Sequence, residues 1–430
     1  MAEKTIPPRA PAAEALERDN FLRRLGPGLV TGAADDDPSG IATYSQVGAQ
    51  FGYGLSGAML FCFPFMAVIQ EIAARIGCVS GHGIAHNLRR HYAPGLLRSV
   101  VILLLVANVI NLGADLGAMG AALGLLIGGP VQLYALAFGL VCIVLEVFMT
   151  YDRYAAVLKW TTLSLFTYVA VVLVVDVPWG EALSTMLVPE FKLDSRHATA
   201  LVAILGTTIS PYLFFWQAGQ EVEEQRRRHT KALCTSPRDA GAEFARIRVD
   251  TLVGMGVSNL VALFIIFATA ATLHAHGVTT ITTSAQAAEA LRPIAGVLSF
   301  GLFALGIIGT GMLAVPVLAG SAAYAVSELF NWPEGLNRRP REAKAFYATI
   351  GAATLAGAAI TFVGIDPMKA LYWSAVVNGV LAAPLMAVMM LIARNPRVMG
   401  KLTLSRTMTW GGWAAAALMT GASVLFFVLL

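Results

Sequence analysis

The sequence predicts an all-helical integral membrane protein with eleven transmembrane helices, two of which are broken by proline. Three observations support this prediction. The 430 residues are 57% hydrophobic and only 13% charged, about half the charged fraction of a typical soluble domain. Apolar stretches of about 20 residues, the length that crosses a bilayer, recur along the chain. Two of these stretches carry a proline beside polar residues near their middle.

Eleven stretches have the length and composition of a membrane span. Their predicted bounds are 26–51, 54–77, 98–126, 131–150, 153–176, 198–222, 249–275, 295–329, 343–364, 367–392 and 409–430. The preceding segment, 1–25, lacks the apolar core of a signal peptide. We therefore expect this segment to be cytoplasmic.

The positive charges indicate how the chain is oriented in the membrane. With the N-terminus in the cytoplasm, all but four of the 30 Lys and Arg residues fall on the cytoplasmic side. The four on the outer side are Lys192, Arg196, Arg292 and Lys369. Cytoplasmic loops carry an excess of Lys and Arg. We therefore predict a multi-pass protein of the cell (inner) membrane with its N-terminus inside and its C-terminus outside.

The first span contains three acidic residues followed by a proline, in the order Asp35, Asp36, Asp37 and Pro38. Carboxylates inside a membrane are costly unless they face water, a cation or a partner. Proline removes a backbone donor and interrupts the helix. Unwound backbone at membrane depth is tolerated where it is buried in protein or lines a cavity. These residues therefore predict a substrate site at the break.

The sixth span repeats this pattern at Ser210-Pro211, with hydroxyl groups clustered at the break. Breaks in spans one and six are expected if residues 26–176 and 198–392 form two inverted repeats of five spans, with 409–430 as an additional helix. Interrupted spans at corresponding positions of two halves are the best indication from sequence of a transporter site.

Composition and motifs argue against other classes of protein. The net charge of +4 is too small to indicate nucleic-acid binding. The four cysteines are scattered without a CxxC pair, so neither a disulfide framework nor a zinc site is expected. We find no nucleophile–base motif and no cofactor fingerprint, so an enzyme is not expected. The cytoplasmic loops are short, which argues against a non-transporting sensor.

At these residues the chain resembles the Nramp family of divalent-metal transporters, which have the LeuT-type fold. Asp37-Pro38 follows Gly26-Pro27-Gly28 by the spacing of the family's first helix. The similarity continues at 70–77 (QEIAARIG), at 87–92 (NLRRHY), at an acidic residue in the third span, and in the eighth and tenth spans. It covers nearly the whole chain and implies transport of a divalent cation, carried as substrate without a cofactor.

The site departs from the family's pattern. The family has Asp-Pro-Gly-Asn in helix 1 and Met-Pro-His in helix 6, where this chain has DPSG at 37–40 and SPY at 210–212. The resemblance implies as metal ligands the side chains of Asp37 and Ser210 and the backbone carbonyls of Ala34 and Thr207. Losing the soft thioether leaves oxygen ligands, which suit Mn²⁺, Mg²⁺ or Ca²⁺. Family members without the methionine are associated with harder ions, which agrees with this expectation.

Further polar residues are candidates for the substrate cavity and for a proton path. Ser210, Phe214, Gln217 and Glu221 share one helix face, which predicts a polar path toward the cytoplasm. We assign Asp115 of the third span and Glu221 to a proton path, with a structural hydrogen bond as the alternative for Asp115. The residues assigned to the cavity are Asp36, Gly40, Thr208, Tyr212, Gln217 and Asn378.

Two functions remain open from the sequence. The first is a secondary or facilitative transporter of a divalent metal cation, either coupled to protons or not, working by alternating access in the bilayer. The second is a transporter of a small organic solute or cation on the same fold. The aromatic residues that follow Pro211 motivate the second function, because they could surround an organic cation. The oligomeric state does not follow from the sequence.

Overall fold

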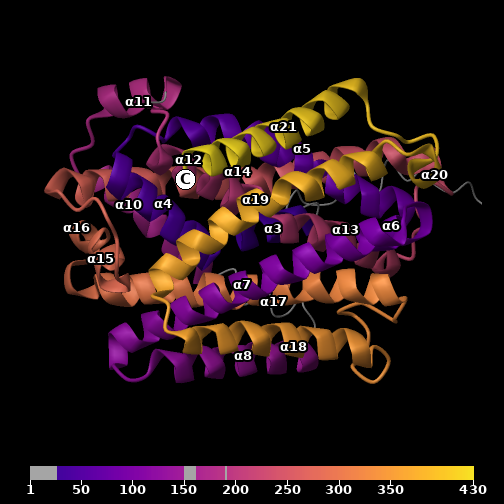
Figure 1. The fold of residues 1–430 in the computed structure, drawn as a ribbon, viewed down its shortest axis with the longest axis horizontal. Coiled ribbons are helices and arrows are strands. Elements are labelled where there is room, and N and C mark those ends of the chain that lie inside the picture. Colours follow the sequence, from indigo (N-terminus) through magenta and orange to yellow (C-terminus); the bar gives the residue numbers. More distant parts are fainter. Residues whose placement is uncertain (1–26, 150–160, 189–190) are drawn as a thin grey trace, which may run out of the picture.

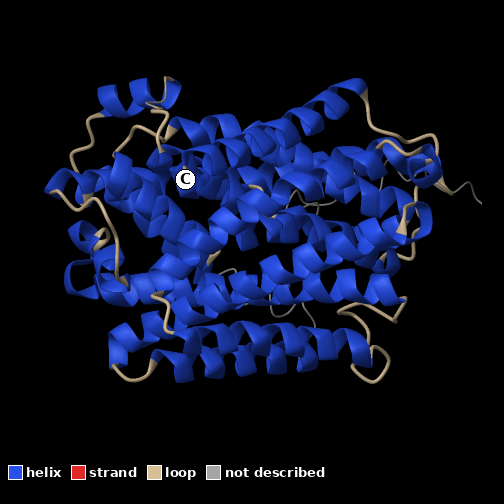
Figure 2. Cartoon of the chain, in the orientation of Figure 1, coloured by secondary structure: helices blue, strands red, loops and turns tan. Residues whose placement is uncertain are grey.

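The computed structural model describes residues 27–149, 161–188 and 191–430, and these ranges contain helices, loops and no strand (Figure 2). Long helices run along the long axis of the molecule (Figure 1). Short helices lie at its two ends, with α15 and α16 at one end and α6 and α20 at the other. The predicted all-helical class is confirmed.

The helices that precede the second break belong to, or lie between, the first five predicted spans and the first half of the sixth. They are α3 (Pro27–Asp35), α4 (Pro38–Phe51), α5 (Gly57–Ser80), α6 (Ile84–His91), α7 (Pro94–Ile127), α8 (Val131–Phe148), α10 (Phe166–Val174), α11 (Trp179–Leu187) and α12 (Ser195–Thr208).

The helices that follow the break complete the bundle. They are α13 (Pro211–Arg227), α14 (Ala240–Thr272), α15 (Ser284–Glu289), α16 (Arg292–Ala295), α17 (Ser299–Phe330), α18 (Lys344–Ile360), α19 (Pro367–Ala393), α20 (Pro396–Met399) and α21 (Arg406–Leu429). Five short 3-10 helices occur at 161–165, 237–239, 274–276, 296–298 and 361–363.

The described residues contain nine stretches long and apolar enough to cross a membrane, or ten if the bent pair Leu163–Val174 and Trp179–Leu187 is one span. The first predicted span is divided into α3 and α4, of 9 and 14 residues, and neither half is that long alone. The fifth predicted span, 153–176, begins outside the described residues. The total of eleven spans and the two inverted repeats stay predictions.

Four helix contacts position the two broken helices. α3 and α4 pack along α14, α12 packs against α19, and α13 packs against α5. Glycine permits the close approach at these contacts, as Gly32 and Gly206 illustrate. Any side chain at Gly32 would collide with the backbone of Gly254 in α14, and any side chain at Gly206 would collide with the backbone at Ala375 and Gly379 in α19. Small residues allow helix backbones to approach closely within a membrane.

Candidate functional site

The first break places the carboxylate of Asp37 at the start of a helix. α3 ends at Asp35, and α4 begins at Pro38. Asp37 has extended backbone angles (φ −71°, ψ 171°), and its Oδ1 accepts a hydrogen bond from the Gly40 backbone N–H at 2.7 Å. Proline suits the first helical position because its missing N–H would be unpaired there. Asp37 thus serves as the N-cap of α4 and is buried.

The second break is closed by its own hydroxyl groups. α12 ends at Thr208, whose side chain donates to the carbonyl of Ile204 within the same helix at 2.8 Å. The Ser210 hydroxyl lies 2.8 Å from the carbonyl oxygen of Gly206 and 3.0 Å from that of Thr207, so it can donate to either. The serine that replaces the family's methionine therefore approaches carbonyls at the end of α12. The Thr207 carbonyl, predicted as a metal ligand, is within hydrogen-bond distance of this hydroxyl.

The two breaks meet at Tyr212. Its hydroxyl lies 3.1 Å from Asp37 Oδ2 and 3.3 Å from the carbonyl oxygen of Ala34, so it can donate to either. Gly40 lies against Thr207, since a Cβ at Gly40 would be 3.2 Å from Thr207 Oγ1. The structure thus gathers these five sequence-predicted residues around one buried point.

Asn111 of α7 belongs to this group, although the sequence analysis did not identify it. Its Nδ2 donates to Asp37 Oδ2 at 3.3 Å, and its Oδ1 accepts from Asn378 of α19 at 3.3 Å. Asn111 and Asn378 are both buried. The available signal was a polar residue in an apolar span, one helical turn before Asp115. Asn378, predicted to face the cavity, therefore reaches Asp37 through Asn111.

Asp35 and Asp36 have a different neighbour from Asp37. The hydroxyl of Ser258 in α14 lies 2.7 Å from Asp35 Oδ2 and 3.0 Å from Asp36 Oδ1. One hydroxyl carries one hydrogen, so Ser258 donates to one of the two carboxylates at a time. Both aspartates are buried. Asp36, predicted to line the cavity, thus faces α14, whereas Asp37 faces α7 and α13.

Several buried oxygens around the breaks have no hydrogen-bond partner within the described ranges. They are Asp35 Oδ1, Ser39 Oγ, Thr43 Oγ1, Tyr44 Oη, Thr207 Oγ1 and both carboxylate oxygens of Asp115. Asp115 lies in α7 near Asp37 and the Ser39 backbone N–H. Buried polar groups normally have partners, because leaving one unpaired costs about 1–3 kcal/mol. Oxygen donors of this kind are the ones that hydrated divalent cations prefer.

A chain of buried polar side chains runs along α13. The Thr31 hydroxyl of α3 lies 2.5 Å from Gln217 Oε1 and 2.7 Å from the Pro27 carbonyl oxygen, so it can donate to either. Gln217 donates to Glu221 at 3.3 Å, and Glu221 forms an ion pair with Arg246 of α14 at 2.6 Å. Glu221 and Arg246 also line a cavity of about 310 Å³. The cytoplasmic part of the predicted polar face is therefore connected, whereas the Ser210 hydroxyl turns to carbonyls of α12.

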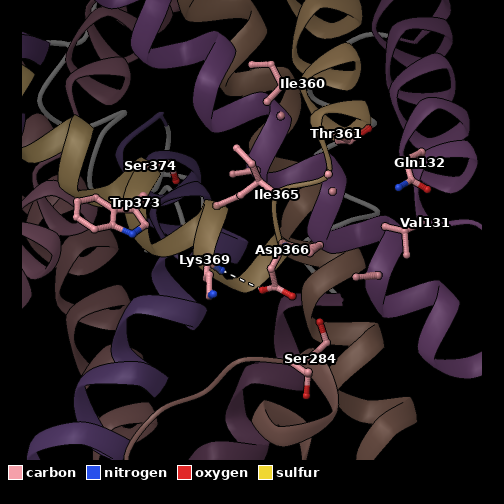
Figure 3. Close-up of a pocket in the computed structure, with 18 of the residues that line it drawn as sticks. Val131, Gln132, Ser284, Ile360, Thr361, Ile365, Asp366, Lys369, Trp373 and Ser374 are labelled. Carbon is pink, nitrogen blue, oxygen red and sulfur yellow. Dashed lines mark hydrogen bonds between the residues drawn. The ribbon is translucent and has the colours of Figure 1, made fainter.

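A second cavity, of about 650 Å³, lies between α7, α8 and the start of α19 (Figure 3). Asp366 accepts from the backbone N–H groups of Met368 and Lys369 at its rim. Ser374 lies one helical turn before Asn378 and contributes to the lining. In the predicted orientation this cavity is on the outer side. Ile110 and Val377, which also line it, are adjacent in sequence to Asn111 and Asn378, the pair that reaches Asp37.

Comparison with known proteins decides the family. A family model described as natural resistance-associated macrophage protein-like (Nramp) matches residues 28–429. The chain belongs to the Nramp family. Curated Nramp relatives are similarly long. The divalent metal cation transporter MntH of Verminephrobacter eiseniae is 26% identical, with 88% of this chain and 83% of that protein covered. The protein of the same name from Klebsiella pneumoniae is 26% identical, with 92% of each covered.

Solved structures show the same fold. The Eremococcus coleocola manganese transporter superposes with a TM-score of 0.74 at 18% identity, covering 97% of this chain and 88% of that one. The transporter MhsT, solved with L-phenylalanine, gives a TM-score of 0.60 at 13% identity, with 96% and 99% covered. The expected LeuT-type architecture of an Nramp protein is thereby confirmed, and the family consists of transporters, not enzymes.

Proposed function

We propose that this protein carries a divalent metal cation across the inner membrane by alternating access, with Asp37 as the principal ligand. The single observation that carries the proposal is the position of Asp37, a buried carboxylate at the point where both broken helices meet. Family membership and the printed names of the relatives support a metal substrate. The asymmetry of Lys and Arg supports a cytoplasmic N-terminus and an outer C-terminus.

The proposed ion is Mn²⁺ or a harder ion such as Mg²⁺. The side chains that hydrogen-bond to Asp37, those of Tyr212 and Asn111, provide oxygen and nitrogen and no sulfur. Carboxylate and carbonyl oxygens suit Mg²⁺ and Mn²⁺ better than softer metals. The carbonyls of Ala34 and Thr207 would contribute once the hydroxyls that approach them turn away. Because Mg²⁺ keeps several waters when bound, a small set of protein ligands is enough.

We assign proton transfer, if it accompanies the metal, to Asp115 and Glu221. Asp115 is a buried acid near Asp37. Glu221 ends the polar chain that starts at Thr31. The family's histidine is replaced by Tyr212, so these two carboxyl groups are the candidates to carry protons along the path.

The aromatic residues after the second break give little support to an organic substrate. Trp216 is buried and packs edge-on against Tyr324 of α17, with ring centroids 6.3 Å apart. Its indole therefore contributes to helix packing. Of the aromatic residues at 212–216, the described contacts join only Tyr212 to Asp37.

The test is uptake into proteoliposomes that contain the purified protein. We expect Mn²⁺ or Mg²⁺ to enter down a concentration gradient, and a pH-sensitive dye inside the vesicles to report any accompanying protons. Absence of flux for every divalent ion tested, with correctly folded protein, would overturn the proposal. Thermal stabilisation by an organic ligand and by no divalent ion would instead favour an organic substrate.

A further inference from the structure

A basic cavity lies at the end of the molecule where α6 and α20 are found (Figure 1). It has a volume of about 430 Å³ and is formed by the ends of α5 and α13, by α6, by the loop at 229–236 and by α20. Its lining includes Arg90, Arg226, Arg397, His82 and His91. No Asp or Glu is among the described residues that line it.

The positive charge of this cavity is only partly balanced. Arg226 lies 3.5 Å from Glu223 and 4.0 Å from Glu334. Arg90 and Arg397 have no carboxylate within 4.0 Å in the part of the chain that the structure describes. Both side chains are exposed. Two arginines thus face one cavity with their guanidinium groups available to a ligand.

The positive charge of the cavity also affects its two histidines. The pKa of His82 is lowered by burial and then by the charges of Arg226 and Arg90. The pKa of His91 is lowered by burial and then by Arg90 and Arg397. Nearby positive charge disfavours a protonated imidazole. A bound anion would reverse this effect.

The walls of the cavity are held in place by hydrogen bonds. The backbone N–H groups of Leu233 and Cys234 donate to the carbonyls of Cys78 and Val79 at 3.2 and 3.0 Å, which fixes the loop against α5. Asn87 donates to the carbonyl of Gly83 at 2.8 Å, within the turn before α6. The arginines therefore project from a defined frame.

We propose that this cavity is a binding site for a phosphate group, carried either by a membrane phospholipid or by a soluble phosphate. Arginine presents a planar set of donors that matches phosphate oxygens and pairs with them through two parallel hydrogen bonds. Basic pockets at the cytoplasmic ends of membrane helices suit anionic headgroups. A phosphate held by Arg90, Arg226 and Arg397 would join α6, α13 and α20, and so tie the end of a broken helix to its neighbours.

The chain contains a native reporter for this site. Cys234 lines the cavity and is exposed, whereas Cys62, Cys78 and Cys142 are buried. An uncharged maleimide should therefore modify Cys234 selectively in the full-length protein. We expect inorganic phosphate in detergent, or phosphatidylglycerol in vesicles, to slow this reaction several-fold compared with chloride or phosphatidylcholine.

The two arms distinguish the source of the phosphate. Protection by inorganic phosphate assigns a soluble ligand, and protection only in phosphatidylglycerol vesicles assigns a lipid headgroup. The double variant Arg90→Gln/Arg397→Gln should raise the concentration of inorganic phosphate needed for half-maximal protection by about tenfold or more, and should remove most of the protection by phosphatidylglycerol, because hydrogen bonds between arginine and a charged acceptor are strong. The control Arg394→Gln removes an exposed arginine of the neighbouring segment that does not line this cavity.

A second measurement tests whether the phosphate binds in this cavity. The pKa of His82, followed by NMR in the full-length protein, should rise when the phosphate ligand is added and should not rise in the double variant. Equal melting temperatures of the variants would show that they fold. Unchanged labelling of Cys234 in both arms, or protection that persists in the double variant, would overturn the proposal.

Discussion

In the proposed orientation, the ion pair between Glu221 and Arg246 should hold the cytoplasmic side closed, and its two members should contribute unequally. Glu221 is fully buried, and apart from Arg246 its carboxylate is hydrogen-bonded only to the Gln217 amide among the described residues. Arg246 is also paired with Glu243 at 2.8 Å, and its side chain is 11% exposed. Arg246→Leu would leave the buried Glu221 carboxylate without its ion-pair partner. Glu221→Gln would leave the arginine with a second carboxylate.

The expected free-energy costs of the two substitutions follow from this difference. A buried charge that loses its partner costs about 3–5 kcal/mol, whereas losing one hydrogen bond between groups that keep other partners costs about 1–2 kcal/mol. Both groups would be hydrated once the cytoplasmic side opens, so the cost falls on the closed conformation. A difference of about 2 kcal/mol corresponds to roughly a thirtyfold difference in the open population. Arg246→Leu should therefore open the protein far more than Glu221→Gln.

The assay measures access from the cytoplasm. Phe214 is buried on the same face of α13, between the break and Gln217. In a Cys234→Ser background, Phe214→Cys should react slowly with a thiol reagent added to inside-out vesicles. The reaction should become slightly faster with Glu221→Gln and much faster with Arg246→Leu. If Glu221→Gln accelerated the reaction as much as Arg246→Leu, or if neither variant did so, the reasoning would be refuted.

Three further predictions concern the site, the helix contacts and the cytoplasmic end. Asp37→Ala should abolish metal uptake by proteoliposomes, while Asp176→Ala, at an exposed acid, should not; uptake retained at the wild-type rate would remove Asp37 from the site. Gly206→Ala should lower stability by about 1–3 kcal/mol in thermal melts, because a Cβ there collides with α19; Gly301→Ala, with nothing within 4 Å of the added atom, should have little effect. Burial raises the pKa of Glu334 to about 7, so the stability that its protonated form contributes should be lost as pH rises through 7; melting between about pH 5 and pH 8 should show this loss, and Glu334→Gln should remove it.

The sequence predicts the location of the site better than the identity of its partners. Asp37 and Ser210 can be found because proline and a short run of polar residues interrupt an apolar span, which is a local feature. Asn111 and Ser258 could not be assigned in this way. One polar residue in an apolar helix does not show which neighbour it faces, because that depends on how α7 and α14 pack around the breaks.

Side-chain direction is a further limit of the sequence analysis. Ser210 and Thr208 both stand at the second break, and both hydroxyls turn back to carbonyls of α12. The sequence shows that hydroxyl groups are present at the break. It does not show whether they bind backbone carbonyls or face the substrate. The long apolar helices, by contrast, follow from composition alone. Helix α7 extends beyond its predicted bounds by four residues at its start, where Pro94 begins the helix.

The two halves of the second broken helix pack mainly against different neighbours, whereas both halves of the first pack along α14. In the second broken helix, α12 is joined to α19 through Gly206, while α13 is joined to α5, where any side chain on Gly77 would collide with the backbone of Ala218. The residues between them, 209 and 210, belong to neither contact. Each half therefore makes its most extensive contact with a different helix, and residues 209 and 210 link the two contacts. A movement of α5 relative to α19 would be felt at these two residues, and would change the geometry at Tyr212 and Asp37.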